Sequence, residues 1–138
     1  MSLSINERRN GAVVILDLVG KIRLGEDNIN LHRVLQRLVG EGEKSVLINL
    51  EEVRSIDSSG LGELIAGYAS LERSGGELKL LKLTARVSEL MAIAKLLTVF
   101  DVYETEAEAV RNFSTVPAAV TQPLDGSRIQ KAKATSIF

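Results

Sequence analysis

Residues 45–68, SVLINLEEVRSIDSSGLGELIAGY, indicate the fold more clearly than any other part of the chain. The run 45–50 is rich in Val, Leu and Ile, which is typical of a buried strand. The charged residues after it predict a polar loop that leads to Asp57; they are Glu51, Glu52 and Arg54. Apolar residues then recur at the spacing of one helix face, and these are Leu61, Leu64, Ile65 and Tyr68. A buried strand followed by an amphipathic helix is the repeating unit of α/β folds.

The same alternation continues towards the N-terminus. Residues 3–8 and 12–19 predict two strands, and Asn10-Gly11 between them is a strong signal for the tight turn of a hairpin. A helix is predicted next from the helical spacing of Leu31, Val34, Leu35, Leu38 and Val39. Asn28 or Asn30 is expected to cap its start. Gly40 or Gly42 is expected to end it.

Towards the C-terminus the pattern repeats. Residues 74–76, Ser-Gly-Gly, are expected to stop the second helix, and residues 77–83 predict a short strand. Thr84 is expected to cap a third helix, whose apolar stripe is Val87, Leu90, Met91, Ala94 and Leu97. A last short strand is predicted at residues 99–103. Thr105 and Glu108 form a capping box that opens a short fourth helix, which ends near Phe113.

These elements predict an α/β fold with a mainly parallel central sheet of about five strands, four helices and right-handed crossovers. Residues 1–113 are expected to form this single domain. The composition changes in residues 114–138, which contain both prolines and three basic residues against one acidic residue. We expect this segment to be a flexible C-terminal extension.

The composition excludes several classes of function. Of the 138 residues 45% are hydrophobic but only 4% aromatic, so the core must be aliphatic. The formal net charge of −1 differs from the basic field of nucleic-acid-binding domains. The absence of Cys and the single His, His32, argue against a metal site. The start of the chain lacks the apolar stretch of a signal peptide, and no apolar run could span a membrane, so we expect a cytoplasmic protein.

The segment 57–62, Asp-Ser-Ser-Gly-Leu-Gly, carries the functional signal. Asp57 and the serines after it are good N-cap residues for the second helix. Gly60 and Gly62 both fall near its first turn, where each glycine costs about 1 kcal/mol relative to Ala. Glycines at such a position allow another backbone or a phosphate to approach the helix end closely. The hydroxyls of Ser58 and Ser59 are therefore expected at a helix N-terminus beside a strand end.

Enzyme classes that use a serine do not fit this segment. A serine hydrolase needs a base, and the only histidine, His32, is predicted on a separate helix. The nucleophile-elbow pattern Gly-x-Ser-x-Gly is absent, as is the Gly-Lys-Ser/Thr loop of nucleotide-binding proteins. We expect no catalytic residue and no cofactor.

The segment 57–62 resembles the signature of the STAS-domain anti-sigma factor antagonists (anti-anti-sigma factors). Three further segments resemble the same family: Gly20-Lys21-Ile22 at the end of a strand, residues 46–50 before the motif, and residues 96–100 with 104–110 as the closing strand and helix. The resemblance covers residues 3–113 and so leaves out only the two termini.

The resemblance implies a partner switch. In the family, an anti-sigma factor that is also a serine kinase phosphorylates the residue directly after the motif's Asp, which is Ser58 here; the adjacent Ser59 is the alternative acceptor. The unphosphorylated form binds the anti-sigma factor and releases a sigma factor, and a serine phosphatase resets the switch. No direct contact with nucleic acid or a membrane is implied. Recognition by the partner and kinase is expected of Asp57, Ser59, Gly60, Leu61, Gly62 and Glu63.

The chain departs from the family pattern at Glu63, where relatives often carry an aliphatic residue, and in the extension 114–138. A different partner could follow from either departure. The alternative function is a STAS scaffold or sensor module of a stress-signalling assembly, or the soluble subunit of a lipid transporter. In that case Ser58 would be only a helix cap.

Overall fold

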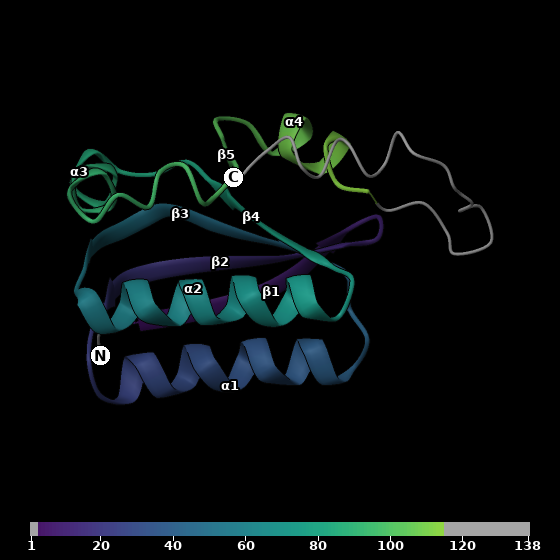
Figure 1. The fold of residues 1–138 in the computed structure, drawn as a ribbon, viewed down its shortest axis with the longest axis horizontal. Coiled ribbons are helices and arrows are strands. Elements are labelled where there is room, and N and C mark those ends of the chain that lie inside the picture. The colour runs from purple at the N-terminus through teal and green to yellow at the C-terminus, as the bar shows by residue number, and fades with distance from the viewer. Residues whose placement is uncertain (1–2, 115–138) are drawn as a thin grey trace.

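The computed structural model describes residues 3–114 and contains a mixed five-stranded sheet (Figure 1). Its elements in chain order are β1 (Leu3–Asn10), β2 (Val13–Ile22), α1 (Glu26–Gly40), β3 (Ser45–Ile56), α2 (Ser58–Arg73), β4 (Glu77–Leu81), α3 (Ala85–Ile93), β5 (Val102–Tyr103) and α4 (Glu106–Arg111). The strand order is β1-β2-β3-β4-β5, with β1 antiparallel to β2 and all other pairs parallel. The predicted fold class is therefore confirmed. The predicted extension, apart from Ser114, lies outside the described residues.

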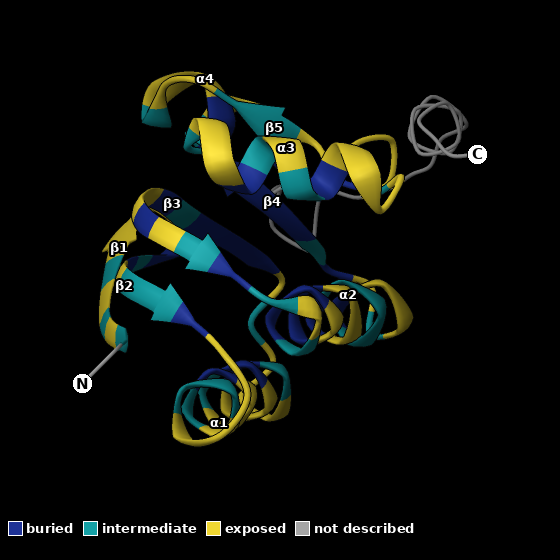
Figure 2. Cartoon of the chain, turned by 90° about the vertical axis from the view of Figure 1, so that its left-hand side faces the viewer, coloured by how far each residue is buried: buried dark blue, intermediate teal, exposed yellow. Residues whose placement is uncertain are grey.

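The sheet is covered on both faces (Figure 2). Helices α1 and α2 lie on one side of it, and α3 and α4 lie on the other. The first part of β2 is buried on both faces, as its alternating side chains show: Val14 and Leu16 belong to the large core, and Val13 and Ile15 to a smaller core with Phe113. Two-sided burial explains why these first four residues of β2 are all apolar.

The hairpin forms at the predicted place. Asn10 pairs with Val13, and Gly11 has a φ of 64°, which glycine adopts at no steric cost. Arg8 of β1 then contacts both Asp17 of β2 and Glu106 of α4, with shortest N–O distances of 2.5 and 2.9 Å. The hairpin is thereby joined to the last helix.

The prediction of a polar loop at residues 51–54 was wrong, because β3 continues to Ile56. Its pairing with β2 is irregular: Val19 pairs with Glu52, Gly20 with Val53 and Lys21 with Ser55. These shifts give β3 extra residues relative to β2, which is the mark of β-bulges. The bulged strand keeps Val53 buried while the charged residues beside it stay exposed.

The start of α1 also differs from the prediction. The helix begins at Glu26 after Gly25, and its first turn has no side-chain cap, so neither Asn28 nor Asn30 is the N-cap. The acidic Glu26 and Asp27 complement the helix dipole there instead. At the other end Gly40 is the last helical residue. Gly42, the second glycine that was expected to end the helix, has a φ of 82°, which directs the chain away from the helix axis.

Three boundaries in the second half were predicted too long or misplaced. Strand β4 ends at Leu81, β5 contains two residues, and α3 ends at Ile93, so Ala94 and Leu97 are not on its stripe. Lys95 with a φ of 62° explains the end of α3. On α2, Ile65 is 37% exposed rather than buried with Leu61 and Leu64. The predicted caps Thr84 and Thr105 were correct: Thr84 accepts a hydrogen bond from the Val87 amide, and Thr105 from the Glu108 amide, which is the Thr105 half of the predicted capping box.

Candidate functional site

The site lies where β2 and β3 end and α1 and α2 begin. Because β2 and β3 are parallel neighbours, the loops that follow them meet at one edge of the sheet. The Asp57 amide donates a hydrogen bond of 3.1 Å to the carbonyl oxygen of Ile22, which ties the two strand ends together. Helix α2 starts at the next residue, Ser58. The predicted serine segment is therefore at a helix N-terminus, as its sequence suggested.

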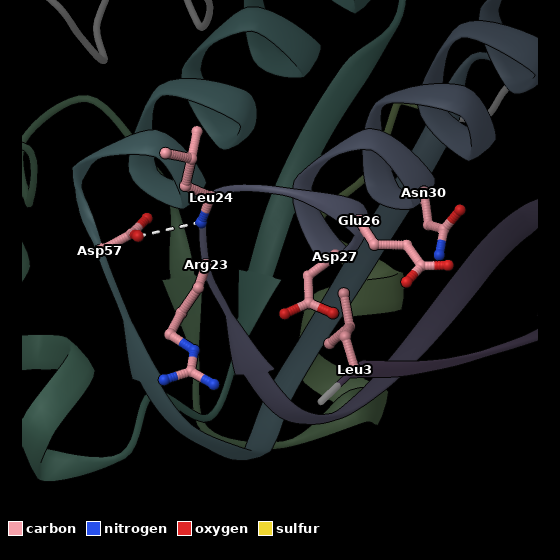
Figure 3. A pocket seen from close by; sticks show the side chains of 7 residues that line it. All are labelled: Leu3, Arg23, Leu24, Glu26, Asp27, Asn30 and Asp57. Atoms are coloured by element: carbon pink, nitrogen blue, oxygen red, sulfur yellow. Dashed lines mark hydrogen bonds between the residues drawn. The ribbon is translucent and has the colours of Figure 1, made fainter. Parts of the chain in front are cut away.

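Asp57 joins both loops through its carboxylate. Its Oδ1 accepts a 3.0 Å hydrogen bond from the Gly60 amide and so caps α2. Its Oδ2 accepts a second 3.0 Å bond from the Leu24 amide, in the loop between β2 and α1 (Figure 3). One side chain therefore fixes the start of α2 and the loop before α1. The cap was predicted, but the bond to Leu24 was not, because no spacing rule relates residues in different loops.

The pKa of Asp57 is lowered from its ordinary value. Partial burial of the carboxyl group opposes ionisation, but hydrogen bonds from the amides of Leu24, Gly60 and Ser59, with the nearby Arg23 cation, outweigh it. The side chain is thus a carboxylate at neutral pH, and both of its oxygens can accept hydrogen bonds from the two loops.

The two glycines of the segment have different roles. A Cβ on Gly60 would lie 2.7 Å from Ile56 Cγ1 and 2.8 Å from the Ile22 carbonyl oxygen, so only glycine lets α2 start this close to the strands. A Cβ on Gly62 would meet no atom within 4 Å. Close approach inside the fold therefore explains Gly60, whereas Gly62 leaves a bare stretch of backbone on the surface.

The remaining predicted site residues divide into surface and interior. Ser58 is exposed and Ser59 partly exposed. Leu61 is buried in the large core, with 8% of its surface exposed. Ser58 is therefore more exposed to solvent than Asp57 and Ser59 on either side of it.

Glu63 is also interior, with 9% of its surface exposed. Its Oε2 lies 2.7 Å from Nδ1 of His32 on α1, whose side chain is 53% exposed. The sequence predicted His32 on a separate helix and gave no sign of this pair, because no spacing rule relates residues on different helices. The Glu63 carboxylate thus has a polar partner in the α1–α2 seam, and His32 is the member of the pair that faces solvent.

An open pocket of about 580 Å³ adjoins the Asp57 loop. Figure 3 shows Arg23 in it between Asp57 on one side and Asp27 on the other. Its other lining residues are Leu3, Leu24, Glu26 and Asn30. Within residues 3–114, no group of three or more His, Cys, Asp or Glu side chains is arranged to hold a metal ion.

Comparison with known proteins places this site in a family. The STAS domain model matches residues 4–109. The chain belongs to the STAS domain family. The matched range includes both loops that Asp57 joins and the whole of α2. In the described part of the chain, none of the helices has the length and apolar character needed to cross a membrane.

Individual relatives carry related names. The anti-sigma F factor antagonist of Paenibacillus polymyxa is 22% identical over 116 residues, which cover 84% of this chain and 99% of the relative. The anti-sigma-B factor antagonist of Staphylococcus aureus is 33% identical over 79 residues, or 56% of this chain and 73% of the relative. The structure of the Bacillus cell fate determinant SpoIIAA in its phosphorylated form has the same fold, with a TM-score of 0.64 at 19% identity over 78% of this chain and 97% of that one.

Proposed function

We propose that this STAS protein is an anti-sigma factor antagonist switched by phosphorylation of Ser58. Its unphosphorylated form binds an anti-sigma factor that is also a serine kinase, and a sigma factor is released. The observation that carries the proposal is the exposed Ser58 at the first position of α2, next to the Asp57 carboxylate that fixes both loops. The names of the two curated relatives support the same class of partner.

The phosphoryl transfer needs no catalytic group from this chain. The Ser58 Oγ attacks the γ-phosphorus of ATP bound to the kinase, an O–P bond forms, ADP leaves, and the hydroxyl proton passes to a base of the kinase. Hydrolysis of the phosphoserine by a separate phosphatase restores the hydroxyl. In this proposal the chain is a substrate and a binding module in the cytoplasm, not an enzyme.

The fold should tolerate the phosphate. A phosphoserine carries a charge of about −1.5 to −2, and the amides at the start of a helix favour such a charge. The first turn of α2 contains no acidic residue, and the adjacent Asp57 carboxylate is held at the N-cap by the amides of Gly60 and Leu24. Asp57 and the carboxylates of Glu26 and Asp27 already make this edge acidic, so the added charge changes mainly what an approaching surface meets.

The test is a peptide-level mass spectrum of the protein isolated from its own host, with Ser58→Ala and Ser59→Ala as matched variants. We expect one phosphate on Ser58 that Ser58→Ala removes and Ser59→Ala keeps. A purified ATP-binding anti-sigma factor from the same host should bind the unphosphorylated protein and transfer phosphate to it. If phosphate is absent under every growth condition and no such kinase binds, the chain is a STAS scaffold or transporter module, and Ser58 is only the first residue of α2 after the Asp57 cap.

A further inference from the structure

A second depression borders the pocket of Figure 3, and its charged lining residues are all basic. It is a groove of about 470 Å³ and shares Leu3 and Arg23 with the pocket of Figure 3. Its lining residues are Leu3, Ser4, Val19, Gly20, Lys21, Arg23 and Arg54. Three of these are cations and none is acidic. Arg23 stands at the boundary, so the surface beside Ser58 changes from acidic to basic across one side chain.

The groove lies on the outer face of the sheet, because of how β2 alternates. Leu18 and Ile22 face the core with α1 and α2, so Val19 and Lys21 point to the opposite face. Val19 is 47% exposed, which shows that α3 and α4 do not cover this part of the sheet. The bulges of β3 bring Arg54 to the same groove. The sheet therefore has an exposed apolar side chain, Val19, edged by cations.

The three cations form no ion pair within the described fold, although the charge of Arg23 also acts on the Asp57 carboxylate. The arginines and lysines that form ion pairs there are others, such as Arg8, Arg9, Arg37 and Lys79, and neither Lys21, Arg23 nor Arg54 pairs with a carboxylate in residues 3–114. Two carboxylates of β3 lie near these cations. Glu51 forms an ion pair with Lys82, and Glu52, although it pairs with Val19 across the strands, is not among the residues that line the groove. Surface cations gathered without internal partners are available to an external acidic group.

We propose that this groove, which we define by Val19, Lys21, Arg23 and Arg54, docks an acidic segment of the anti-sigma factor. The inference rests on the proposed function and extends its interface from Ser58 onto the open sheet face. Charge complementarity indicates carboxylates on the partner, and the exposed Val19 gives them an apolar neighbour. Three cations on a chain of net charge −1 do not make the broad basic field that nucleic acids require.

The charge reversal Lys21→Glu/Arg54→Glu tests the groove. Arg23 stays unchanged because its charge also acts on Asp57. The control is Arg73→Glu/Arg111→Glu, which makes the same change of charge at the last residues of α2 and α4. Arg73 lies at the opposite end of the 16-residue helix α2 from Ser58, about 23 Å away along the helix axis. Melting temperatures of both variants establish that each one folds.

Binding is measured with the purified anti-sigma factor kinase by titration calorimetry, at low and at high salt. We expect the groove variant to bind about tenfold to a hundredfold more weakly at low salt, with a smaller difference at high salt, and the control to bind within about twofold of the wild type. A carbodiimide, which joins amines only to carboxylates in contact, should also link Lys21 to an Asp or Glu of the kinase.

The outcomes separate the two proposals. If the wild type does not bind the kinase, the proposed function fails. If the wild type binds, but the groove variant binds equally at both salt concentrations and Lys21 forms no cross-link, the groove inference fails and the proposed function stands. Binding of a 20-nucleotide single strand or of phosphatidylserine vesicles by the wild type but not by the groove variant would assign the groove to another class of partner and overturn the inference.

Discussion

Helices α1 and α2 start next to each other at one edge of the sheet, yet their first turns are built differently. Helix α1 has no side-chain cap and carries Glu26 and Asp27 in its first turn. Helix α2 has one carboxylate, that of its N-cap Asp57, and its first turn carries hydroxyls and no acidic residue. Two permanent charges thus lie within the first turn of α1, whereas the permanent charge of α2 lies at the N-cap, and its first turn can accept a charge that is added later.

The largest effect should come from adding that charge. Ser58→Asp should weaken binding to the anti-sigma factor by about a hundredfold or more, because an uncompensated charge would be buried in the interface. The melting temperature should change little, because α2 favours a negative charge at its start. Ser58→Ala is the control and should bind as the wild type does. If Ser58→Asp kept the full affinity, α2 would be no more a switch than α1.

A second prediction concerns the closeness of α2 to the strands. Gly60→Ala should lower the free energy of unfolding by about 1–3 kcal/mol, because the new methyl group meets Ile56 and the Ile22 carbonyl. Gly62→Ala is the matched control, because its methyl group meets open space. Replacing a glycine by alanine within a helix should raise the free energy of unfolding by up to about 1 kcal/mol. Urea unfolding measures both. Equal effects of the two substitutions would contradict the tight contact at Gly60.

This contrast shows how far the sequence could lead. The order of strands and helices, the hairpin turn and the caps Asp57, Thr84 and Thr105 follow from local rules, because each depends on residues a few positions apart. The Asp57–Leu24 bond, the His32–Glu63 pair and the cationic groove depend on elements that meet only in the folded chain. The sequence could not distinguish Gly60 from Gly62 either, because only the folded structure shows which of them has close neighbours.

A third prediction tests the cap that α1 lacks. Asp57→Ala should lower the free energy of unfolding by about 1–2 kcal/mol, since the amides of Gly60 and Leu24 lose their acceptor. Asp57→Asn keeps an acceptor for the Gly60 amide and should cost less. Urea unfolding at neutral pH measures both variants, and an equal loss in the two would show that the carboxylate's shape is not what holds the loops.

The same residue gives a pH dependence with a defined sign. The pKa of Asp57 is lower in the folded state than its ordinary value of 3.8, so the unfolded chain binds the proton more readily. Its contribution to stability is therefore complete above pH ~4 and is lost as the pH falls through the lower folded pKa. Stability curves of the wild type should fall more steeply in this acid range than those of Asp57→Asn. Parallel curves would show that the amide bonds do not hold the carboxylate.

The smallest effect is expected at α1, where the charges are permanent. Glu26→Gln/Asp27→Asn should lower the free energy of unfolding by about 0.3–1 kcal/mol for each charge removed, because both carboxylates face the helix dipole from an open surface. Salt should reduce this loss, since exposed charges are screened. The matched change at α2, Ser59→Glu, adds a carboxylate to a first turn that has none and should raise stability by a similar amount. If removing the carboxylates from α1 and adding one to α2 changed the free energy of unfolding in the same direction, negative charge in the first turn would not stabilise these helices as proposed.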